Sequence, residues 1–195
     1  QESEELDGPD RRLAQIIQDH SRRMNLVIEN VLQLSRRRQA EPQLLDLKYW
    51  LHRFASEFRQ GLGPQQTLHL DTVGSSLQTR MDPNQLTQVL TNLVQNGLRY
   101  SGQQNPRAQV WLRLFRDEAS DLPIVEVLDD GPGIAAEQLQ NIFEPFFTTE
   151  SKGTGLGLYI SRELCESNQA RLDYRERPEG GSCFRIVFAH PRKLS

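Results

Sequence analysis

The segment NLVQNGLRYS, residues 92–101, has the apolar spacing of an amphipathic helix and carries its polar groups on one side. Helical periodicity places Asn92, Asn96 and Arg99 on that side, with Tyr100 adjacent. The Asn-Gly pair inside the segment can also mark a hairpin turn, but the flanking residues lack the alternation of paired strands. An amide oxygen is a suitable ligand for Mg²⁺, which usually enters proteins together with nucleotide phosphates. The segment therefore predicts a helix that forms part of a phosphate-binding site.

The segment VLDDGPGI, residues 127–134, sets an acidic pair against a Gly-Pro-Gly turn after a run of apolar β-formers. This order of residues is typical of a strand that ends in a loop. Taken alone, it leaves open whether the loop is only a turn or also holds a ligand.

The segment GTGLGL, residues 153–158, places Gly153, Gly155 and Gly157 at the start of a predicted helix. Closely spaced glycines let backbone N–H groups approach a ligand, and a helix N-terminus favours an anion such as a phosphate. A flexible loop explains the pattern equally well. The spacing is neither that of a Rossmann turn nor that of a P-loop, so we disfavour those two nucleotide-binding folds.

The composition is that of a globular protein without an overall basic character. The 195 residues are 36% hydrophobic and carry a formal net charge of -3. Because nucleic-acid backbones are bound mainly by Lys and Arg, we expect no nucleic-acid partner. The two cysteines lack the spacing of zinc ligands. No apolar run approaches the roughly 20 residues of a membrane span and the N-terminus is not a signal peptide, so we expect a cytosolic location.

Residues 9–38 carry apolar side chains in the alternating four-three spacing of a heptad seam. Pro9 suits the first turn of a helix. We therefore expect one long amphipathic helix of the bundle type, whose partner helix is missing from this sequence. A helix that lies on the core of its own domain is the alternative. Residues 38–46, which contain Pro42, are expected to form a linker. The seam positions are Leu13, Ile17, His20, Met24, Val27, Val31 and Leu34.

The chain after residue 46 mixes helical and strand patterns without strict alternation. Asp82 is placed to cap one predicted helix, Pro83 to open it and Gly102 to close it. The mixture favours an α+β fold, a two-layer sandwich with helices on one face of a mixed sheet, over a doubly wound fold. We expect helices at residues 47–62, 82–102, 135–143 and 155–167, and strands at residues 67–72, 77–82, 108–115, 124–129, 170–175 and 182–188.

Four segments in order, NLVQNGLRYS, DDGPGI, FEPFFTT and GTGLGL, resemble the N, G1, F and G2 boxes of the sensor histidine kinases. The ATP-binding domain of that family shares a superfamily with gyrase, Hsp90 and MutL. The resemblance implies a two-layer α/β sandwich of the Bergerat type over residues 46–195, a catalytic ATP-binding domain. It implies that residues 1–45 are the second helix of a dimerisation and phosphotransfer hairpin, followed by a linker.

The resemblance also implies the nucleotide contacts. Asp129 would accept a hydrogen bond from the adenine amino group, while Gly131 and Gly133 let the chain pass close to the base and Asp130 is solvated. Asn96 would hold Mg²⁺. The implied nucleotide-binding residues are Asn92, Asn96, Arg99, Tyr100, Asp129, Gly131, Gly133, Ile134, Phe143, Lys152, Gly153, Thr154, Gly155, Leu156, Gly157 and Leu158.

Residues from about 135 to 154 correspond to a mobile lid in the same family. Phe143, Phe146 and Phe147 would anchor it, and plain core packing explains these aromatic residues as well. Lys152 would meet the terminal phosphate, or lie exposed without a contact. The sequence departs from the family at Glu150, where a basic residue is frequent.

Two further departures from the family pattern affect the protein structure rather than the nucleotide contacts. Gly97 stands where alanine is usual, which weakens the helix by roughly 0.5–1 kcal/mol. The segment SNQA, residues 167–170, replaces the usual His-Gly-Gly turn, which concerns only the geometry of that connection.

None of the four histidines lies in the phosphoacceptor motif of the family, in which an acidic residue follows the His. His20 is expected to pack in the seam, so we expect the chain to be a fragment that begins after the acceptor. Hydrolytic relatives carry a Glu at the position of Asn92, where it activates water. Its absence favours transfer of the γ-phosphoryl group of ATP to an imidazole, which needs little deprotonation. The alternatives are a gyrase-like or Hsp90-like ATPase and a nucleotide-sensing pseudokinase.

The partners follow from the same resemblance. The family passes its phosphoryl group to an Asp of a response regulator and is a homodimer when intact. The segment LCESNQARLDYR, residues 164–175, most resembles pilin-regulating sensor kinases that signal to σ54-dependent activators. Any membrane contact would be made by parts of the protein outside this chain.

Overall fold

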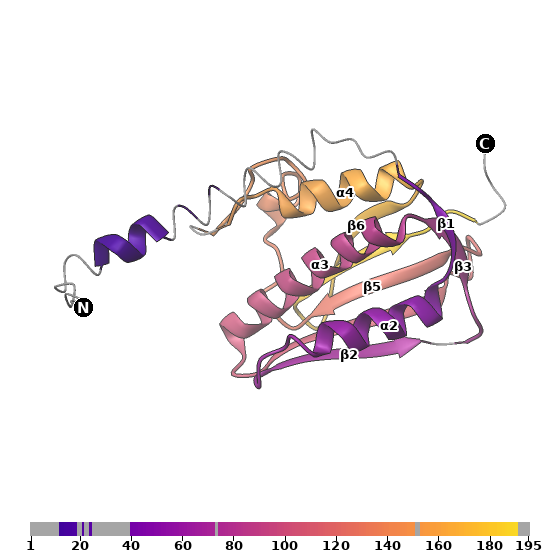
Figure 1. Ribbon diagram of the computed structural model, residues 1–195, viewed down its shortest axis with the longest axis horizontal. Helices are drawn as coiled ribbons and strands as arrows, with labels where there is room; N and C mark the ends of the chain where they lie inside the picture. The colour runs from indigo at the N-terminus through magenta and orange to yellow at the C-terminus, as the bar shows by residue number, and fades with distance from the viewer. Residues whose placement is uncertain are drawn as a thin grey trace, which may run out of the picture.

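The computed structural model describes residues 12–18, 21, 24, 40–72, 74–150 and 153–190 (Figure 1). Residues 12–18, 21 and 24 are helical, and Leu13, Ile16, Ile17 and Met24 are exposed. The rest of the helix expected over residues 9–38, including His20, lies outside the described residues. Within the described ranges, no helix combines the length and the apolar character needed to cross a bilayer.

The centre of the fold is a five-stranded mixed sheet with the order β2-β4-β5-β7-β6. The pair β2–β4 is parallel and the other pairs are antiparallel. A second, two-stranded antiparallel sheet pairs β1 with β3. The strands are β1 (Gln43–Asp46), β2 (Gln66–Thr72), β3 (Gln78–Met81), β4 (Ala108–Arg116), β5 (Pro123–Asp129), β6 (Arg171–Glu176) and β7 (Ser182–Val187).

Three helices lie on one face of the five-stranded sheet (Figure 1). They are α2 (Leu47–Arg59), α3 (Pro83–Gln104) and α4 (Gly157–Ser167), with a 3-10 turn η1 (Ala136–Gln138) between β5 and α4. Each helix turns an apolar side toward the sheet, as its amphipathic spacing predicts. The two-layer α+β arrangement expected from the sequence is therefore confirmed.

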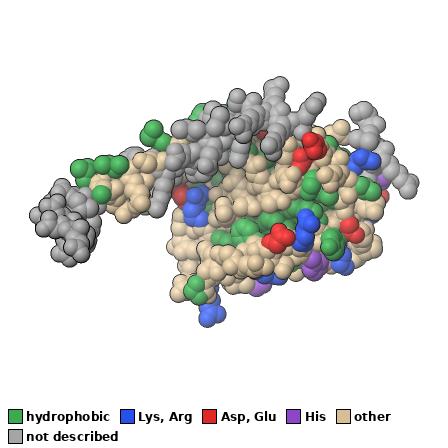
Figure 2. Space-filling model, viewed as in Figure 1, with side chains coloured by type: hydrophobic (Ala, Val, Ile, Leu, Met, Phe, Trp, Pro, Cys, Tyr) green, Lys and Arg blue, Asp and Glu red, His purple; other side chains and the backbone are tan. Residues whose placement is uncertain are grey.

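The core lies between the helices and the sheet. Every residue of β5 is buried, because this strand is central and has a neighbour on both sides. Val125 and Val127 belong to the core cluster under the helices, together with residues from all three helices. Apolar side chains also reach the surface in a band on the helical face (Figure 2).

The start of α3 follows the sequence prediction. The Asp82 side chain accepts hydrogen bonds from the backbone N–H groups of Asn84 (2.8 Å) and Gln85 (3.2 Å), and Pro83 opens the helix. The predicted end at Gly102 is wrong. Gly102 does not have a positive φ, so it forms no left-handed cap, and α3 continues to Gln104 with Asn105 as its C-cap.

Two other expectations need correction. Residues 43–46, expected to belong to a linker, form β1 because they pair with β3, and Leu45 packs against the core. The helix expected at residues 135–143 is only η1 followed by turns. Successive backbone hydrogen bonds there close three-residue turns, for example from Asn141 N–H to Gln138 C=O (2.8 Å). The tighter turns bring Ile142 to a buried position.

Asn168, just after α4, joins the end of that helix to the start of α3. Its Oδ1 accepts a hydrogen bond from the backbone N–H of Asp82 (2.8 Å). Its Nδ2 donates to the Leu164 carbonyl (2.8 Å) and to Gln85 Oε1 (2.6 Å). The side chain is only 4% exposed. The SNQA segment therefore does more than shape a turn, because it fixes α4 against the capped end of α3.

We predict that Asn168→Ala lowers the free energy of unfolding by about 2 kcal/mol. The substitution leaves the N–H of Asp82 buried without its partner, and an unsatisfied buried group costs about 1–3 kcal/mol. Urea unfolding followed by circular dichroism measures the change. Asn141→Ala is the matched control, because that side chain is exposed and should change stability by less than about 0.5 kcal/mol. Equal stability of the two variants would contradict the role of Asn168.

Candidate functional site

A cavity of about 570 Å³ is bounded by α3, the end of β5, the segment between β5 and α4, and the first residues of α4. Its lining includes most of the residues singled out in the sequence, which lie far apart along the chain. These are Asn92, Asn96, Arg99, Tyr100, Asp129, Gly133, Ile134, Gly153, Thr154, Gly155, Gly157 and Leu158. Gly131, Phe143 and Leu156 do not line the cavity, and Lys152 lies outside the described residues.

Asp129 is the last residue of β5 and is only 3% exposed. Its Oδ1 accepts hydrogen bonds from the backbone N–H groups of Gly131 (2.9 Å) and Ser182 (3.1 Å). Burial raises the pKa of the Asp129 carboxyl, and these hydrogen bonds partly offset that effect. The cavity therefore contains a carboxylate with a fixed orientation.

The supports of Asp129 other than Gly131 come from the β6–β7 hairpin and were not identified from the sequence. The backbone of Gly181 lies so close to the Asp129 carbonyl that a Cβ atom there has no room. Arg177 Nη1 donates to the same carbonyl oxygen (2.5 Å). Only the antiparallel pairing of β5 with β7 brings this hairpin to Asp129, so no local pattern indicates it.

The glycines after Asp129 mainly allow close packing of the protein against itself. A Cβ on Gly131 would lie 2.9 Å from the Tyr100 carbonyl carbon, and one on Gly133 would lie 3.1 Å from the Gly181 oxygen. Gly133 also has a φ of 74°, in the region that favours glycine. The need for glycine at these two positions is thus explained by neighbouring backbone, whereas the sequence interpretation had assigned it to a ligand.

Asp130 was expected to be solvated, and this is wrong. Its carboxylate accepts a hydrogen bond from the Ser101 hydroxyl, and its carbonyl accepts one from Asn105 Nδ2 (3.1 Å). Asp130 is half-buried by these contacts. Both partners lie at the end of α3, so Asp130 fastens the turn after β5 to that helix.

Asn92 connects α3 to α4. Its Nδ2 donates to the Gly157 carbonyl (2.6 Å) and to the Ser161 hydroxyl (3.1 Å). A Cβ on Gly157 would lie 2.9 Å from this amide, so glycine is required where the two helices meet. The amide thus holds the start of α4 at the wall of the cavity.

Asn96 and Arg99, on neighbouring turns of α3, form a polar cluster with Glu150 of the segment between β5 and α4. Arg99 Nη2 donates to Asn96 Oδ1 (2.9 Å), and Arg99 Nη1 lies 3.2 Å from Glu150 Oε2. Gln103 Nε2 donates to the other Glu150 oxygen (3.0 Å). The Arg99 guanidinium also lies 5.1 Å from the centre of the Tyr100 ring. The sequence marked Glu150 only as a departure from the family pattern. Its contacts with Arg99 and Gln103 are seen only in the folded structure.

The aromatic residues of the segment between β5 and α4 differ in their surroundings. Phe143 packs edge-on against Phe184, with ring centres 6.5 Å apart, and Phe147 lines the cavity. Phe146 is 63% exposed and has a φ of 68°. Its backbone leaves no room for a side chain at Gly155. Core packing therefore explains Phe143, and close backbone contact explains Gly155.

The charges of the cavity are few. Arg99 is the one Lys or Arg side chain among its described lining residues, and Asp129 is the one carboxylate among them. In the described part of the chain, no cluster of His, Cys, Asp and Glu could hold a metal ion without other ligands. The remaining donors are uncharged. They are hydroxyl and amide side chains and the backbone N–H groups of the glycine segment and the start of α4, and the backbone groups at a helix N-terminus favour an anion.

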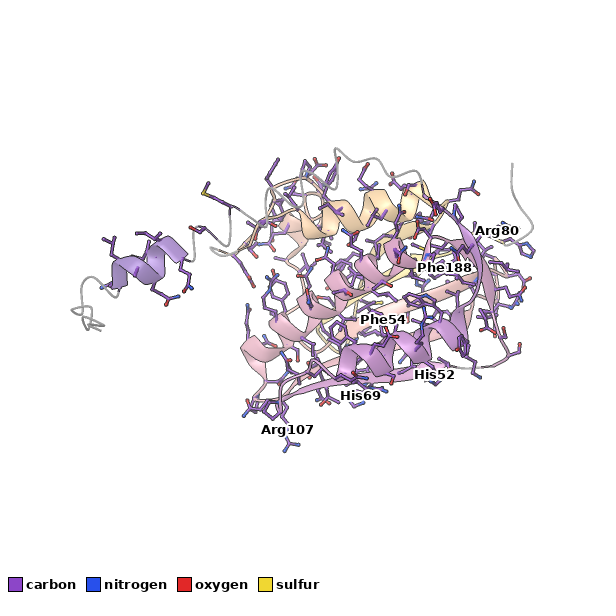
Figure 3. All side chains as sticks on the ribbon, viewed as in Figure 1. His52, Phe54, His69, Arg80, Arg107 and Phe188 are labelled. Carbon is purple, nitrogen blue, oxygen red and sulfur yellow. The ribbon has the colours of Figure 1, made fainter. Side chains whose placement is uncertain are left out.

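The described histidines lie elsewhere. His52 on α2 and His69 on β2 lie on the side of the domain away from α4, and His69 stacks on Trp111 with ring centres 5.2 Å apart (Figure 3). His190 follows β7 and does not line the cavity either. Among the described residues, the cavity therefore contains no nucleophilic imidazole.

Comparison with known proteins agrees with this geometry. Residues 81–192 match the family of histidine kinase-, DNA gyrase B- and HSP90-like ATPases. Sensor protein kinase PilS of Pseudomonas aeruginosa is 73% identical over 195 residues, which are all of this chain and 37% of that protein. The sensory histidine kinase/phosphatase NtrB of Rhodobacter capsulatus is 34% identical over 93% of this chain and 53% of its own length.

The fold is also similar to a solved kinase structure. Histidine kinase ThkA, solved in complex with the response regulator protein TrrA, matches all of this chain and 54% of its own with a TM-score of 0.74 and 24% identity. The chain spans only about a third to a half of the curated relatives named above. The family match covers more than half of the chain and includes α3, the end of β5 and the glycine segment. The chain belongs to the family of histidine kinase-, DNA gyrase B- and HSP90-like ATPases.

Proposed function

We propose that this chain is the ATP-binding catalytic core of a two-component sensor histidine kinase. The observation that carries the proposal is the buried Asp129 carboxylate in one cavity with Asn96, Arg99 and the glycine segment. The volume of about 570 Å³ lies within the usual range of roughly 300–1,000 Å³ for small-molecule sites. The 73% identity to a sensor protein kinase over the whole chain supports the same function.

Asp129 is the residue that would select the base. A carboxylate accepts hydrogen bonds and suits the amino group of adenine, whereas guanine presents a carbonyl at the corresponding edge. The two backbone N–H groups that bind Oδ1 hold the carboxylate in one orientation. An oriented acceptor discriminates between the bases more strongly than a mobile one.

The phosphates would lie near Arg99 and the backbone N–H groups at the start of α4. The described residues fit a magnesium ion only as one that arrives with the nucleotide. Among them no cluster of His, Cys, Asp and Glu forms a cage, and Asn96 offers a neutral amide oxygen that accepts a hydrogen bond from Arg99. Bound Mg²⁺ would neutralise phosphate charge. Residues 135–154 would form the lid over the phosphates.

Phosphoryl transfer is favoured over hydrolysis by the surroundings of Asn92. Its amide is engaged with Gly157 and Ser161, and it cannot act as a base toward water. Asp129, the one carboxylate among the described lining residues, is already held by backbone groups. A neutral imidazole needs little deprotonation, so a histidine supplied from outside these 195 residues is the acceptor that this site suits. A gyrase-like or Hsp90-like ATPase is correspondingly disfavoured.

The remaining parts of the proposal concern the whole protein. Residues 1–45 would supply one helix of a dimerisation and phosphotransfer hairpin, and residues 46–195 the ATP-binding domain of a homodimer. The phosphoryl group would pass from the histidine to an Asp of a response regulator, which we propose to be a σ54-dependent activator. The resemblance of this chain to PilS supports that choice. The domain would work in the cytosol, with any membrane anchor outside these residues.

We predict that the chain binds Mg-ATP and that Asp129→Asn weakens ATP binding about 10- to 100-fold. The loss corresponds to a hydrogen bond to a charged group, which contributes about 1.5–3 kcal/mol. Isothermal titration with ATP and GTP measures the affinities. The wild-type chain should prefer ATP, and the preference should shrink in the variant. Asp71→Asn, an exposed position on β2, is the control and should bind both nucleotides like the wild type. Equal affinity of the wild type for ATP and GTP would refute the role of Asp129.

We also predict that the chain alone gains no acid-labile phosphate from labelled Mg-ATP. The described histidines lie outside the cavity, and transfer requires a nucleophile in line with the phosphate. Label should appear only when an acceptor-helix segment of a related sensor kinase is added, and only on that segment. Asn96→Ala should abolish this transfer while the domain stays folded.

A variant of His20, which lies outside the described residues, completes that experiment. If the chain alone becomes labelled and His20→Gln removes the label, then His20 is an acceptor and the interpretation of the missing residue is wrong. If neither the chain nor the added segment is labelled despite ATP binding, the chain is a nucleotide-binding module rather than a kinase core.

A further inference from the structure

Glu150 lies in the segment between β5 and α4, yet both of its carboxylate oxygens contact α3. Oε2 lies 3.2 Å from Arg99 Nη1, and Oε1 accepts a hydrogen bond from Gln103 Nε2 at 3.0 Å. The side chain is only 19% exposed, so these contacts enclose it. Two donors on successive turns of a helix thus converge on one anionic group at the edge of the cavity.

Arg99 connects this anionic group to the cavity itself. It is the one described cationic side chain that lines the cavity, and it also donates to Asn96 Oδ1 at 2.9 Å. The Arg99 guanidinium therefore contacts Glu150 and Asn96 at the same time. An anionic ligand in the cavity must attract the same guanidinium, because no other described lining side chain carries a positive charge.

We propose that Glu150 is an internal competitor of the nucleotide phosphates for Arg99. In the nucleotide-free chain its carboxylate takes the place of a phosphate against Arg99 and Gln103 and holds the segment between β5 and α4 to α3. When phosphates bind, Arg99 turns from Glu150 to them, the contact to Asn96 is released and Glu150 separates from α3. This inference rests on the proposed function and adds the residue that sets how strongly phosphates bind.

The expected effect is modest, because the pair is partly open to solvent. Arg99 is 45% exposed, and ion pairs of this kind contribute at most about 1 kcal/mol, or roughly five-fold in affinity. Salt should weaken the pair, since exposed charges are screened over about 10 Å at 0.1 M ionic strength. The measurements therefore belong at low ionic strength, with one high-salt comparison.

The first experiment measures the affinity of wild type and Glu150→Gln for ATP, ADP and adenosine by isothermal titration. Competition for Arg99 predicts that the variant binds ATP about three- to five-fold more tightly, ADP less so, and adenosine without change. The control is Glu137→Gln, an equal change of charge at an exposed position of the same segment. An equal gain in the control, or the same change for adenosine as for ATP, would overturn the proposal.

A second variant separates competition from general repulsion between Glu150 and phosphate. In an Arg99→Gln background, Glu150 has no guanidinium to hold, so Glu150→Gln should no longer change the affinity for ATP. A gain that persists undiminished in this background would show that Glu150 acts only by repulsion, which refutes the competition for Arg99.

The last experiment needs no nucleotide. Hydrogen exchange of the nucleotide-free chain should be faster in peptides covering residues 145–150 when Glu150 is replaced by Gln, and 0.5 M salt should have the same effect on the wild type. Unchanged exchange would overturn the contact between Glu150 and α3. If no variant binds any nucleotide while exchange still rises in Glu150→Gln, then the proposed function fails and the contact stands without its role in competition.

Discussion

The arrangement of the cavity depends on how the protein keeps a carboxylate buried at the end of its central strand. Burying a charged group is costly unless hydrogen bonds replace its water. Asp129 obtains them from backbone N–H groups on two sides, from Gly131 in the following turn and from Ser182 at the start of β7. The Arg177 side chain binds the carbonyl of the same residue. The β5–β7 pairing, the hairpin before β7 and the turn after β5 must therefore all be in place before Asp129 has its final position.

Hydrogen bonds from two side-chain amides fix the wall of the cavity that α3 and α4 form. Asn92 uses its amide to hold the first turn of α4, and Asn168 uses its amide to hold the end of α4 against the start of α3. Each contact requires a particular neighbour: Gly157 because the Asn92 amide occupies the space of a side chain, and Asp82 because its backbone N–H is buried. Both ends of α4 are thus joined to α3 at the cavity, which favours a preformed site over one assembled by a ligand.

The sequence predicted what depends on local pattern. Helical spacing placed Asn92, Asn96 and Arg99 on one side of α3, and the structure brings all three to one cavity. The alternation of apolar residues predicted the strands, and Asp82 with Pro83 predicted the start of α3. The sequence did not predict that Glu150 meets Arg99, nor that Gly181 and Ser182 support Asp129, because those contacts join segments separated by about 50 residues. The strand β1 was missed for the same reason, since its four residues are ordered by pairing with β3 rather than by their own pattern.

The distribution of charge explains why the site relies on backbone groups. Among the described residues around the cavity, the charged groups are one guanidinium and the carboxylate of Asp129, with the carboxylate of Glu150 at the edge. Side chains alone therefore give the cavity little net attraction for a polyanion. The N-terminus of α4 supplies a positive partial charge without adding a cation, and glycines at 155 and 157 let this segment pack against the Phe146 backbone and the Asn92 amide at the cavity. We therefore propose that this site binds phosphates strongly only when the helix dipole, the Arg99 guanidinium and a cation carried by the ligand act together, and that an anion without its cation is bound weakly.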